Sequence, residues 1–201
     1  DLAWNWSSQR LYDLPIAAPD QLRLRMTWAL YNFIVFGQMG FALDKIEYFN
    51  GLQTNTAGTF KDLMRAVTLH AAMGSFLNNN QNIANSPNEN YARELMQLFT
   101  VGLVKLGPDG SILRDANGKP LETYTQADVI NATKALSGWE FSWVKDLPRT
   151  NGINLKVPMR PRSNKASHDS SQKVVLGVTI PAGQSIEQDL DSLLNILTTH
   201  P

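Results

Sequence analysis

The sequence predicts a mainly α-helical fold, with a single helical domain over residues 1–201 that carries a small β-hairpin insertion and a long irregular region. Apolar residues recur three and four positions apart in several segments, which is the spacing of one face of an α-helix. Many of these segments begin with Ser, Thr or Asp in the position of an N-cap. Helical spacing is lost at about 107–124, where turn residues predict the hairpin, and at about 140–180, where we expect the irregular region.

Three helices are predicted in the first part of the chain. The first follows Pro19-Asp20, with Asp20 as its N-cap, and its apolar face ends at Gly37. The second helix spans 41–49 and stops at Asn50-Gly51. The third spans 60–71. The apolar positions of the first and third helices are Leu22, Met26, Trp28, Ala29, Leu30, Phe33, Phe36, Phe60, Leu63, Met64, Val67 and Ala71.

The segment after Ser86 has the clearest helix start in the chain. Ser86 takes the N-cap position, Pro87 the first helical position and Glu89 the third, which is the pattern of a capping box. Pro at the first position lacks an N–H that the helix would not use. We therefore expect a helix from Pro87 to about Val101, closed by Gly102.

Two later helices also begin with capping pairs. Thr125 with Asp128 starts a helix that ends at Gly138, and Ser185 with Gln188 starts the last one. The face of this last helix consists of Leu190, Leu193, Leu194 and Leu197. The irregular region holds one strand candidate, Lys173-Val174-Val175-Leu176, and no internal repeat is evident.

The composition narrows the classes of function. Lys and Arg together number 18, as do Asp and Glu, so the formal net charge is zero and the basic surface that binds nucleic acid is not expected. The chain has no Cys, which excludes disulfides and thiol catalysis. No apolar run reaches the roughly 20 residues of a membrane-spanning helix. The first residues have no signal-peptide layout and no initiator Met, so we expect any export signal to lie outside this chain.

Three stretches carry a resemblance to a known family. They are 86–102, which contains Asn88-Glu89-Asn90-Tyr91-Ala92-Arg93-Glu94-Leu95, then 124–129, and then 135–139, which ends in Ser137-Gly138-Trp139. Together they closely resemble the bacterial family catalogued as domain of unknown function 1800 (DUF1800). The resemblance implies a mainly helical bacterial protein that is often exported, hence periplasmic or extracellular, and often encoded beside a second uncharacterised family.

The resemblance also implies that this chain is a fragment, because family members are longer and continue past His200-Pro201. It supplies no established catalytic residues. Many members carry His-Asn-His in the early helix, where this chain has Tyr31-Asn32-Phe33, so a metal site built on those histidines does not transfer.

The segment 88–94 admits a structural and a functional interpretation. Glu89 and Arg93 are four residues apart in the order that favours pairing on a helix. We favour a polar network that fixes the fold. The alternative is that Glu94, with Asp128, lines a polar cavity as an acid, a base or a ligand. The residues of the structural polar motif are Ser86, Asn88, Glu89, Asn90, Arg93, Glu94, Tyr124, Thr125 and Trp139.

His168-Asp169 lies in the irregular region. It fits either a general base with its orienting carboxylate, or metal ligands, or a loop His followed by an ordinary turn Asp, which we favour. His70 fits a satisfied, semi-buried side chain. Trp139 is expected to bury its ring with its N–H satisfied.

Two classes of function follow. We favour a structural or interaction module of an exported bacterial protein, whose partner is a protein: either the remainder of its own chain or a neighbouring-gene product. The alternative is a hydrolase or metal-dependent enzyme with a site around Glu94, Asp128 and His168, assisted by Glu89, Arg93 and Asp169. The sequence identifies no cofactor or substrate. The enzyme alternative requires Glu94 and His168 to face one pocket.

Overall fold

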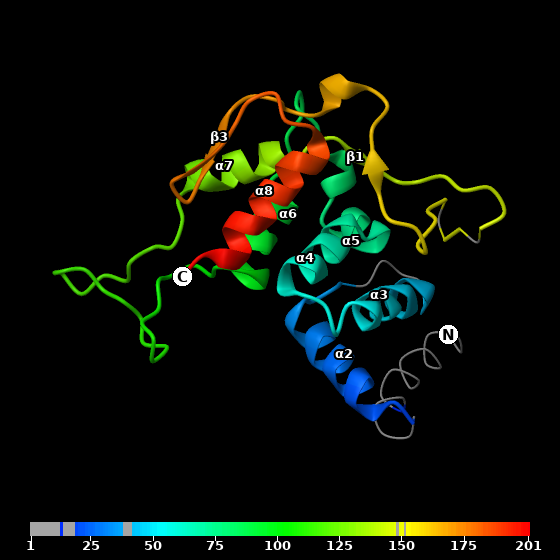
Figure 1. Ribbon diagram of the computed structural model, residues 1–201, viewed down its shortest axis with the longest axis horizontal. Helices are drawn as coiled ribbons and strands as arrows, with labels where there is room; N and C mark the ends of the chain where they lie inside the picture. Colours follow the sequence, from blue (N-terminus) through cyan, green and yellow to red (C-terminus); the bar gives the residue numbers. More distant parts are fainter. Residues whose placement is uncertain (1–12, 14–18, 38–41, 148, 151) are drawn as a thin grey trace. The chain divides into compact units, whose positions relative to one another are not determined.

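The computed structural model describes residue 13 and residues 19–37, 42–147, 149–150 and 152–201. These residues divide into two compact units. The first unit takes its residues from 1–80 and 139–161, and the second from 81–138 and 162–201. The mainly α-helical class is confirmed (Figure 1), while the single domain over residues 1–201 stays a prediction. Within the described residues, no helix is long and apolar enough to cross a membrane.

Four helices and one strand pair form the described part of the first unit. The helices pack in chain order, α2 on α3, α3 on α4 and α4 on α5. The strand pair is antiparallel and joins Trp139 to Pro161. The bounds are α2 Gln21–Phe33, α3 Ala42–Thr54, α4 Phe60–Leu69, α5 Ala71–Phe76, β1 Trp139–Glu140 and β2 Arg160–Pro161, with the short helix η1 Asn79–Gln81 where the two units meet in the chain.

The outcome differs among the predicted helices of this unit. Helix α4 begins with a capping box of Thr59 and Asp62 and buries Leu63, Met64 and Val67 as predicted. The predicted extent of 60–71 is wrong, because α4 ends at Leu69 and Ala71 begins α5, and Phe60 is exposed. Helix α3 continues to Thr54 through Gly51, where a stop was predicted. The predicted start at 41 lies outside the described residues.

Helix α2 departs from its prediction in two ways. Asp20 makes no side-chain cap and instead forms an ion pair with Arg23. The predicted face is also wrong, because Leu22, Met26 and Phe33 are exposed while Leu24 is buried. An apolar pattern marks one side of a helix, but the pattern does not determine which side the rest of the chain covers.

The second unit packs α7 against the hairpin β3–β4 and against α8 (Figure 1). Its bounds are α6 Asn90–Glu94, the π-helix η2 Leu95–Phe99, α7 Gln126–Ala135, η3 Lys165–Ser167, β3 Lys173–Val175, β4 Val178–Ile180 and α8 Ile186–Thr199. The capping boxes at Thr125 and Ser185 are confirmed. So is the leucine face of α8, whose four predicted leucines are all buried. The strand candidate is confirmed as β3, which pairs with β4.

The helix predicted from Pro87 begins later, and its capping box is wrong. Helix α6 starts at Asn90, and the N–H of Asn90 donates to Asn88 Oδ1 at 3.1 Å. The Ser86 backbone forms a bridge with Ile83 instead. Asn82 explains the difference, because its Oδ1 accepts the Asn88 N–H and its Nδ2 donates to the Thr133 carbonyl. These two hydrogen bonds fix residues 82–88 in a turn that is attached to α7. Gly102 closes the helix as predicted, since its N–H donates to Met96 O at 2.9 Å.

The predicted hairpin near 107–124 is part of a larger arm over residues 103–123. Three short segments, 103–107, 111–115 and 119–123, are bridged in pairs. Their central residues donate in a closed cycle: Lys105 N–H to Leu121 O, Leu113 N–H to Lys105 O, and Leu121 N–H to Leu113 O, each at 2.9 Å.

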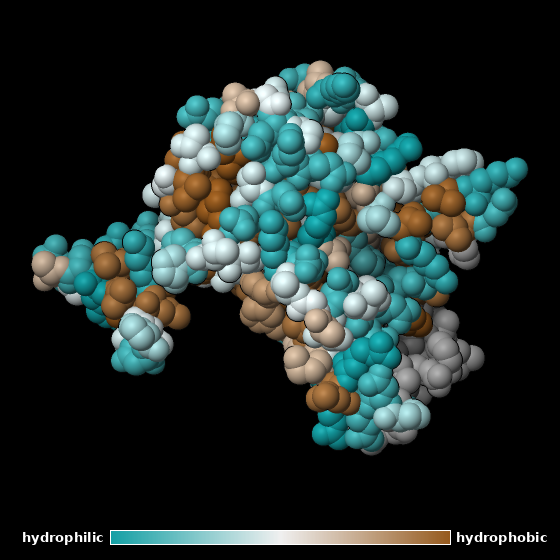
Figure 2. All heavy atoms as spheres, viewed as in Figure 1, coloured by the Kyte–Doolittle hydropathy of each residue, from teal (hydrophilic) through white to brown (hydrophobic). Residues whose placement is uncertain are grey.

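This arrangement repeats every eight residues, which corrects the prediction of no repeat. Gly102, Gly110 and Gly118 precede the three segments and share a left-handed backbone, with φ of 73°, 80° and 79°. The arm extends away from the helices of its unit (Figure 1) and carries exposed apolar side chains (Figure 2). These are Leu103, Leu106, Ile112, Leu113 and Leu121.

Candidate functional site

The polar groups of the 88–94 segment are joined in a surface network. Arg93 Nη2 lies 2.6 Å from Glu89 Oε2, which confirms the predicted pair. The same nitrogen donates to Gln126 Oε1 at 2.7 Å, and Gln126 Nε2 donates back to Glu89 Oε2 at 3.0 Å. The three side chains therefore tie α6 to the start of α7.

Asp128 has a structural task on α7. Its Oδ2 accepts from the Thr125 N–H and hydroxyl at 2.8 and 2.7 Å, and its Oδ1 accepts the Leu176 N–H at 2.7 Å. Burial opposes the charged form, but these hydrogen bonds outweigh it and lower the pKa of Asp128. Asp128 thus remains a carboxylate that holds the β3–β4 turn on the cap of α7.

Glu94 is half-buried beside Tyr124 and Arg93. Burial raises the pKa of the Tyr124 hydroxyl, with Glu94 adding to the rise and Arg93 opposing it. These three groups are near one another, but His168 and Asp128 have their hydrogen bonds elsewhere.

His168 joins a buried cluster in the second unit. Its Nε2 lies 3.0 Å from Asp189 Oδ2 on α8, and its Nδ1 lies 2.9 Å from the Ser137 carbonyl oxygen. Lys173 Nζ on β3 lies 2.6 Å from the same Asp189 oxygen and donates to Ser171 O at 2.7 Å. The side chains of Lys173 and Asp189 are fully buried. Buried charges are tolerated when they are paired and hydrogen-bonded, so this cluster fixes the interior of the unit.

Ser137, His168 and Asp189 follow one another as in a hydrolytic triad, yet the hydrogen bonds do not activate the serine. Ser137 Oγ lies 3.3 Å from His168 Nδ1, but its proton goes to Lys134 O at 2.6 Å. Ser137 Oγ also accepts the Asp169 N–H at 2.9 Å, and His168 Nδ1 lies closer to the Ser137 carbonyl oxygen, at 2.9 Å, than to the hydroxyl. Ser137 is also 1% exposed. The cluster therefore fits a structural role.

Asp169 forms side-chain hydrogen bonds within its own loop. Its Oδ1 accepts from the N–H and hydroxyl of Ser171 at 2.9 and 2.5 Å. Asp169 and Glu89 both line a small cavity of about 80 Å³ in the second unit. This cavity brings two of the predicted catalytic candidates into a shared lining, and Glu94, Asp128 and His168 are not among the residues that line it.

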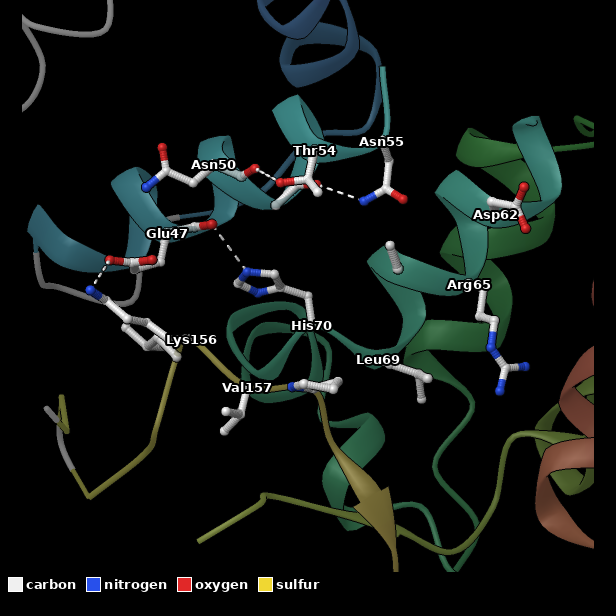
Figure 3. A pocket seen from close by; sticks show the side chains of 14 residues that line it. Glu47, Asn50, Thr54, Asn55, Asp62, Arg65, Leu69, His70, Lys156 and Val157 are labelled. Atoms are coloured by element: carbon white, nitrogen blue, oxygen red, sulfur yellow. Dashed lines mark hydrogen bonds and ion pairs between the residues drawn. The ribbon is translucent and has the colours of Figure 1, made fainter. Parts of the chain in front are cut away.

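A larger cleft lies in the first unit, and sequence reasoning missed it. It has a volume of about 700 Å³ and is walled by α3, α4, His70 between α4 and α5, and residues 155–158. Figure 3 shows the Glu47–Lys156 pair, at 3.7 Å, on one side and Asp62 with Arg65 on the other. The signal in the sequence was a set of polar residues three and four positions apart along 47–55. In the structure these residues lie on the less buried side of α3 and just after it.

His70 lies in the wall of this cleft. Its Nε2 is 3.3 Å from Glu47 O and its Nδ1 accepts the Ala72 N–H at 3.2 Å (Figure 3). Burial lowers the pKa of His70 to about 4, so the ring is neutral and donates through Nε2. Both nitrogens are thus occupied, which confirms the satisfied, semi-buried side chain.

Trp139 buries its ring as predicted, at 1% exposure, but its Nε1–H has no acceptor among the described residues. Within the described part of the chain, no three His, Cys, Asp or Glu side chains gather closely enough to hold a metal ion.

Comparison with known proteins gives one match. Residues 3–201 match the model of the family described as "Protein of unknown function (DUF1800)". No curated protein and no solved structure matches the chain.

Proposed function

We propose that this chain, which belongs to the DUF1800 family, is a structural or interaction module of an exported bacterial protein. The observation that supports the proposal most is the use made of its distinctive polar residues. Glu89 and Arg93 are bonded to each other and to Gln126, and Asp128 is bonded to a helix cap and to Leu176. A catalytic acid or base must be able to reach a substrate, whereas these groups hold neighbouring segments of the chain.

The exposed apolar surface of the arm favours a protein as the binding partner. The arm exposes five large apolar side chains, between 37% and 59% of whose surface is accessible. Exposed apolar clusters of this kind are typical of protein–protein contact. The zero net charge argues against nucleic acid. We place the protein in the periplasm or outside the cell, where the partner is the remainder of its own chain or a neighbouring-gene product.

A binding experiment tests the interaction role. The chain is titrated by calorimetry with the neighbouring-gene product and, separately, with the remainder of its own chain. Binding to one of them should weaken at least tenfold in a variant with Leu106→Ser and Leu113→Ser in the arm. A matched control carries Leu22→Ser on α2, an exposed apolar residue outside the arm. Absence of binding to both partners would refute the interaction role.

An activity experiment tests the enzyme alternative. Chromogenic esters, phosphates and glycosides are offered with and without divalent metal ions to the wild type, Glu94→Gln and His168→Gln. We expect no turnover that depends on either side chain. Turnover in the wild type that both folded variants lose would replace our proposal with the enzyme.

A further inference from the structure

His70 gives the cleft of the first unit a rigid and uncharged wall. Its ring nitrogens are bonded to α3, through the Glu47 carbonyl, and to the first turn of α5, through the Ala72 N–H. The ring also lies so close to α3 that a Cβ added to Gly51 would be 3.0 Å from its Cδ2. Because burial lowers the pKa of His70 to about 4, the ring carries no charge at neutral pH. The cleft is therefore formed before a ligand arrives, which reduces the entropy lost on binding.

Two walls of the cleft present hydrogen-bonding groups that no described residue uses. Asn50 lines the cleft from α3 with an exposed side chain (Figure 3), and its amide has no partner among the described residues. The second wall is residues 155–158, where the Val157 N–H and the carbonyl oxygens of Lys156 and Val157 are likewise unpaired within the described part of the chain. An extended peptide can pair its own N–H and C=O groups with a wall of this kind, as in the addition of a β-strand.

The charged residues of the lining cancel one another. Glu47 and Lys156 are 3.7 Å apart, and the Lys156 side chain remains 56% exposed. Asp62 and Arg65 contribute the second acid and the second base on the other side (Figure 3). The lining therefore has no excess of cations for a phosphate group and no excess of carboxylates for a metal ion. Among the described lining residues there is also no Phe, Tyr or Trp on which a sugar ring could stack. A ligand of balanced charge with hydrogen-bonding groups along its length fits this lining.

We propose that this cleft binds an extended peptide segment of balanced charge. The peptide backbone exchanges hydrogen bonds with Val157, and one of its amide groups bonds to the Asn50 side chain. A basic side chain of the peptide pairs with Glu47 and an acidic one with Lys156, because the 3.7 Å between these two residues leaves both able to take a closer partner. The volume of about 700 Å³ lies within the usual range of about 300–1,000 Å³ for ligand sites and admits a short segment rather than a folded domain. The cleft belongs to the first unit and the arm to the second, so peptide binding here does not depend on the role proposed for the arm.

Nuclear magnetic resonance titration of the whole chain tests the proposal. The probe is a pool of capped, unstructured peptides of equal length, each with one lysine and one glutamate, and two further pools carry only lysine or only glutamate as charged residues. The side-chain amide of Asn50 and the backbone amide of Val157 should shift with the balanced pool and less with either charged pool. Inorganic phosphate and maltotriose, which probe for an anion site and a sugar site, should leave both signals in place. Unmoved signals with the balanced pool, or a larger shift with any other probe, overturn the proposal.

A cleft-filling variant and a charge reversal complete the test. Asn50→Trp places an indole ring in the cleft and should weaken binding of the balanced pool about tenfold. The matched control is Asn195→Trp on α8, which should bind as the wild type: both asparagines are exposed, and the carbonyl of each accepts the hydroxyl of the threonine four residues later. Equal binding by Asn50→Trp and its control refutes the site. Lys156→Glu, at an exposed side chain, makes the lining acidic and should move the preference to the lysine pool, and an unchanged preference refutes the charge matching.

Discussion

Removing the Lys173 ammonium is expected to cost far more stability than deleting an exposed charge of the second unit. Lys173 Nζ and Asp189 Oδ2 are 2.6 Å apart, and both side chains have 0% exposure. In Lys173→Met, Asp189 keeps only His168 as a partner, and its Oδ1 has no hydrogen-bond partner among the described residues. Breaking a buried pair on one side costs about 3–5 kcal/mol, because the other charge remains buried without compensation.

Urea unfolding followed by circular dichroism measures this loss. The double variant Lys173→Met with Asp189→Asn should lose less than Lys173→Met alone, since no uncompensated charge remains. The control is Lys119→Met, which deletes an exposed pair with Glu122 at 3.6 Å and should cost at most about 1 kcal/mol. If Lys173→Met also loses less than about 1 kcal/mol, the buried pair is not the stabilising feature that we describe.

Three further predictions follow from the backbone and the caps. Gly138→Ala should lower the free energy of unfolding by about 1–3 kcal/mol, because φ is 95° and the new Cβ would lie 3.1 Å from His168, whereas Gly110→Ala, with φ of 80° and open space, should cost less in the same thermal melts. Thr125→Ala should cost about 0.5–2 kcal/mol through the lost cap, and Ser86→Ala less than about 0.5 kcal/mol; equal losses in urea unfolding would contradict the helix starts seen here. The lowered pKa of Asp128 means that its contribution is complete above the unfolded value of about 4 and is lost as the pH falls through the folded value, so the stability difference between wild type and Asp128→Asn should shrink in acid; a constant difference would contradict the assigned hydrogen bonds.

Local signals in the sequence predicted local structure. The capping pairs at Thr125 and Ser185 are confirmed because each involves residues three apart, whose contact needs no other part of the chain. Ser86 shows the same pattern and fails, since Asn82 binds Asn88 N–H and Thr133 O and so draws the preceding turn away from the helix. Contacts with distant residues decided this case.

The same limit explains the cluster around His168. Its partners Ser137 and Asp189 lie 31 and 21 residues away, so no local spacing could pair them. A signal was nevertheless present. Asp189 lies three residues after Ile186 and four before Leu193, on the buried face of α8. Lys173 is two residues from Val175, so both lie on the buried side of β3. A charged residue within an apolar stripe indicates a buried partner of opposite charge.

The arm has a consequence for how the family can vary. Its two ends meet, because Thr123 N–H donates to Leu103 O at 3.0 Å. The chain therefore enters and leaves the arm at almost the same point. We expect that a short loop can replace the whole arm without moving the helices before and after it. Each of the three segments forms hydrogen bonds with both of the others, so deletion of one segment would remove hydrogen bonds from the remaining two.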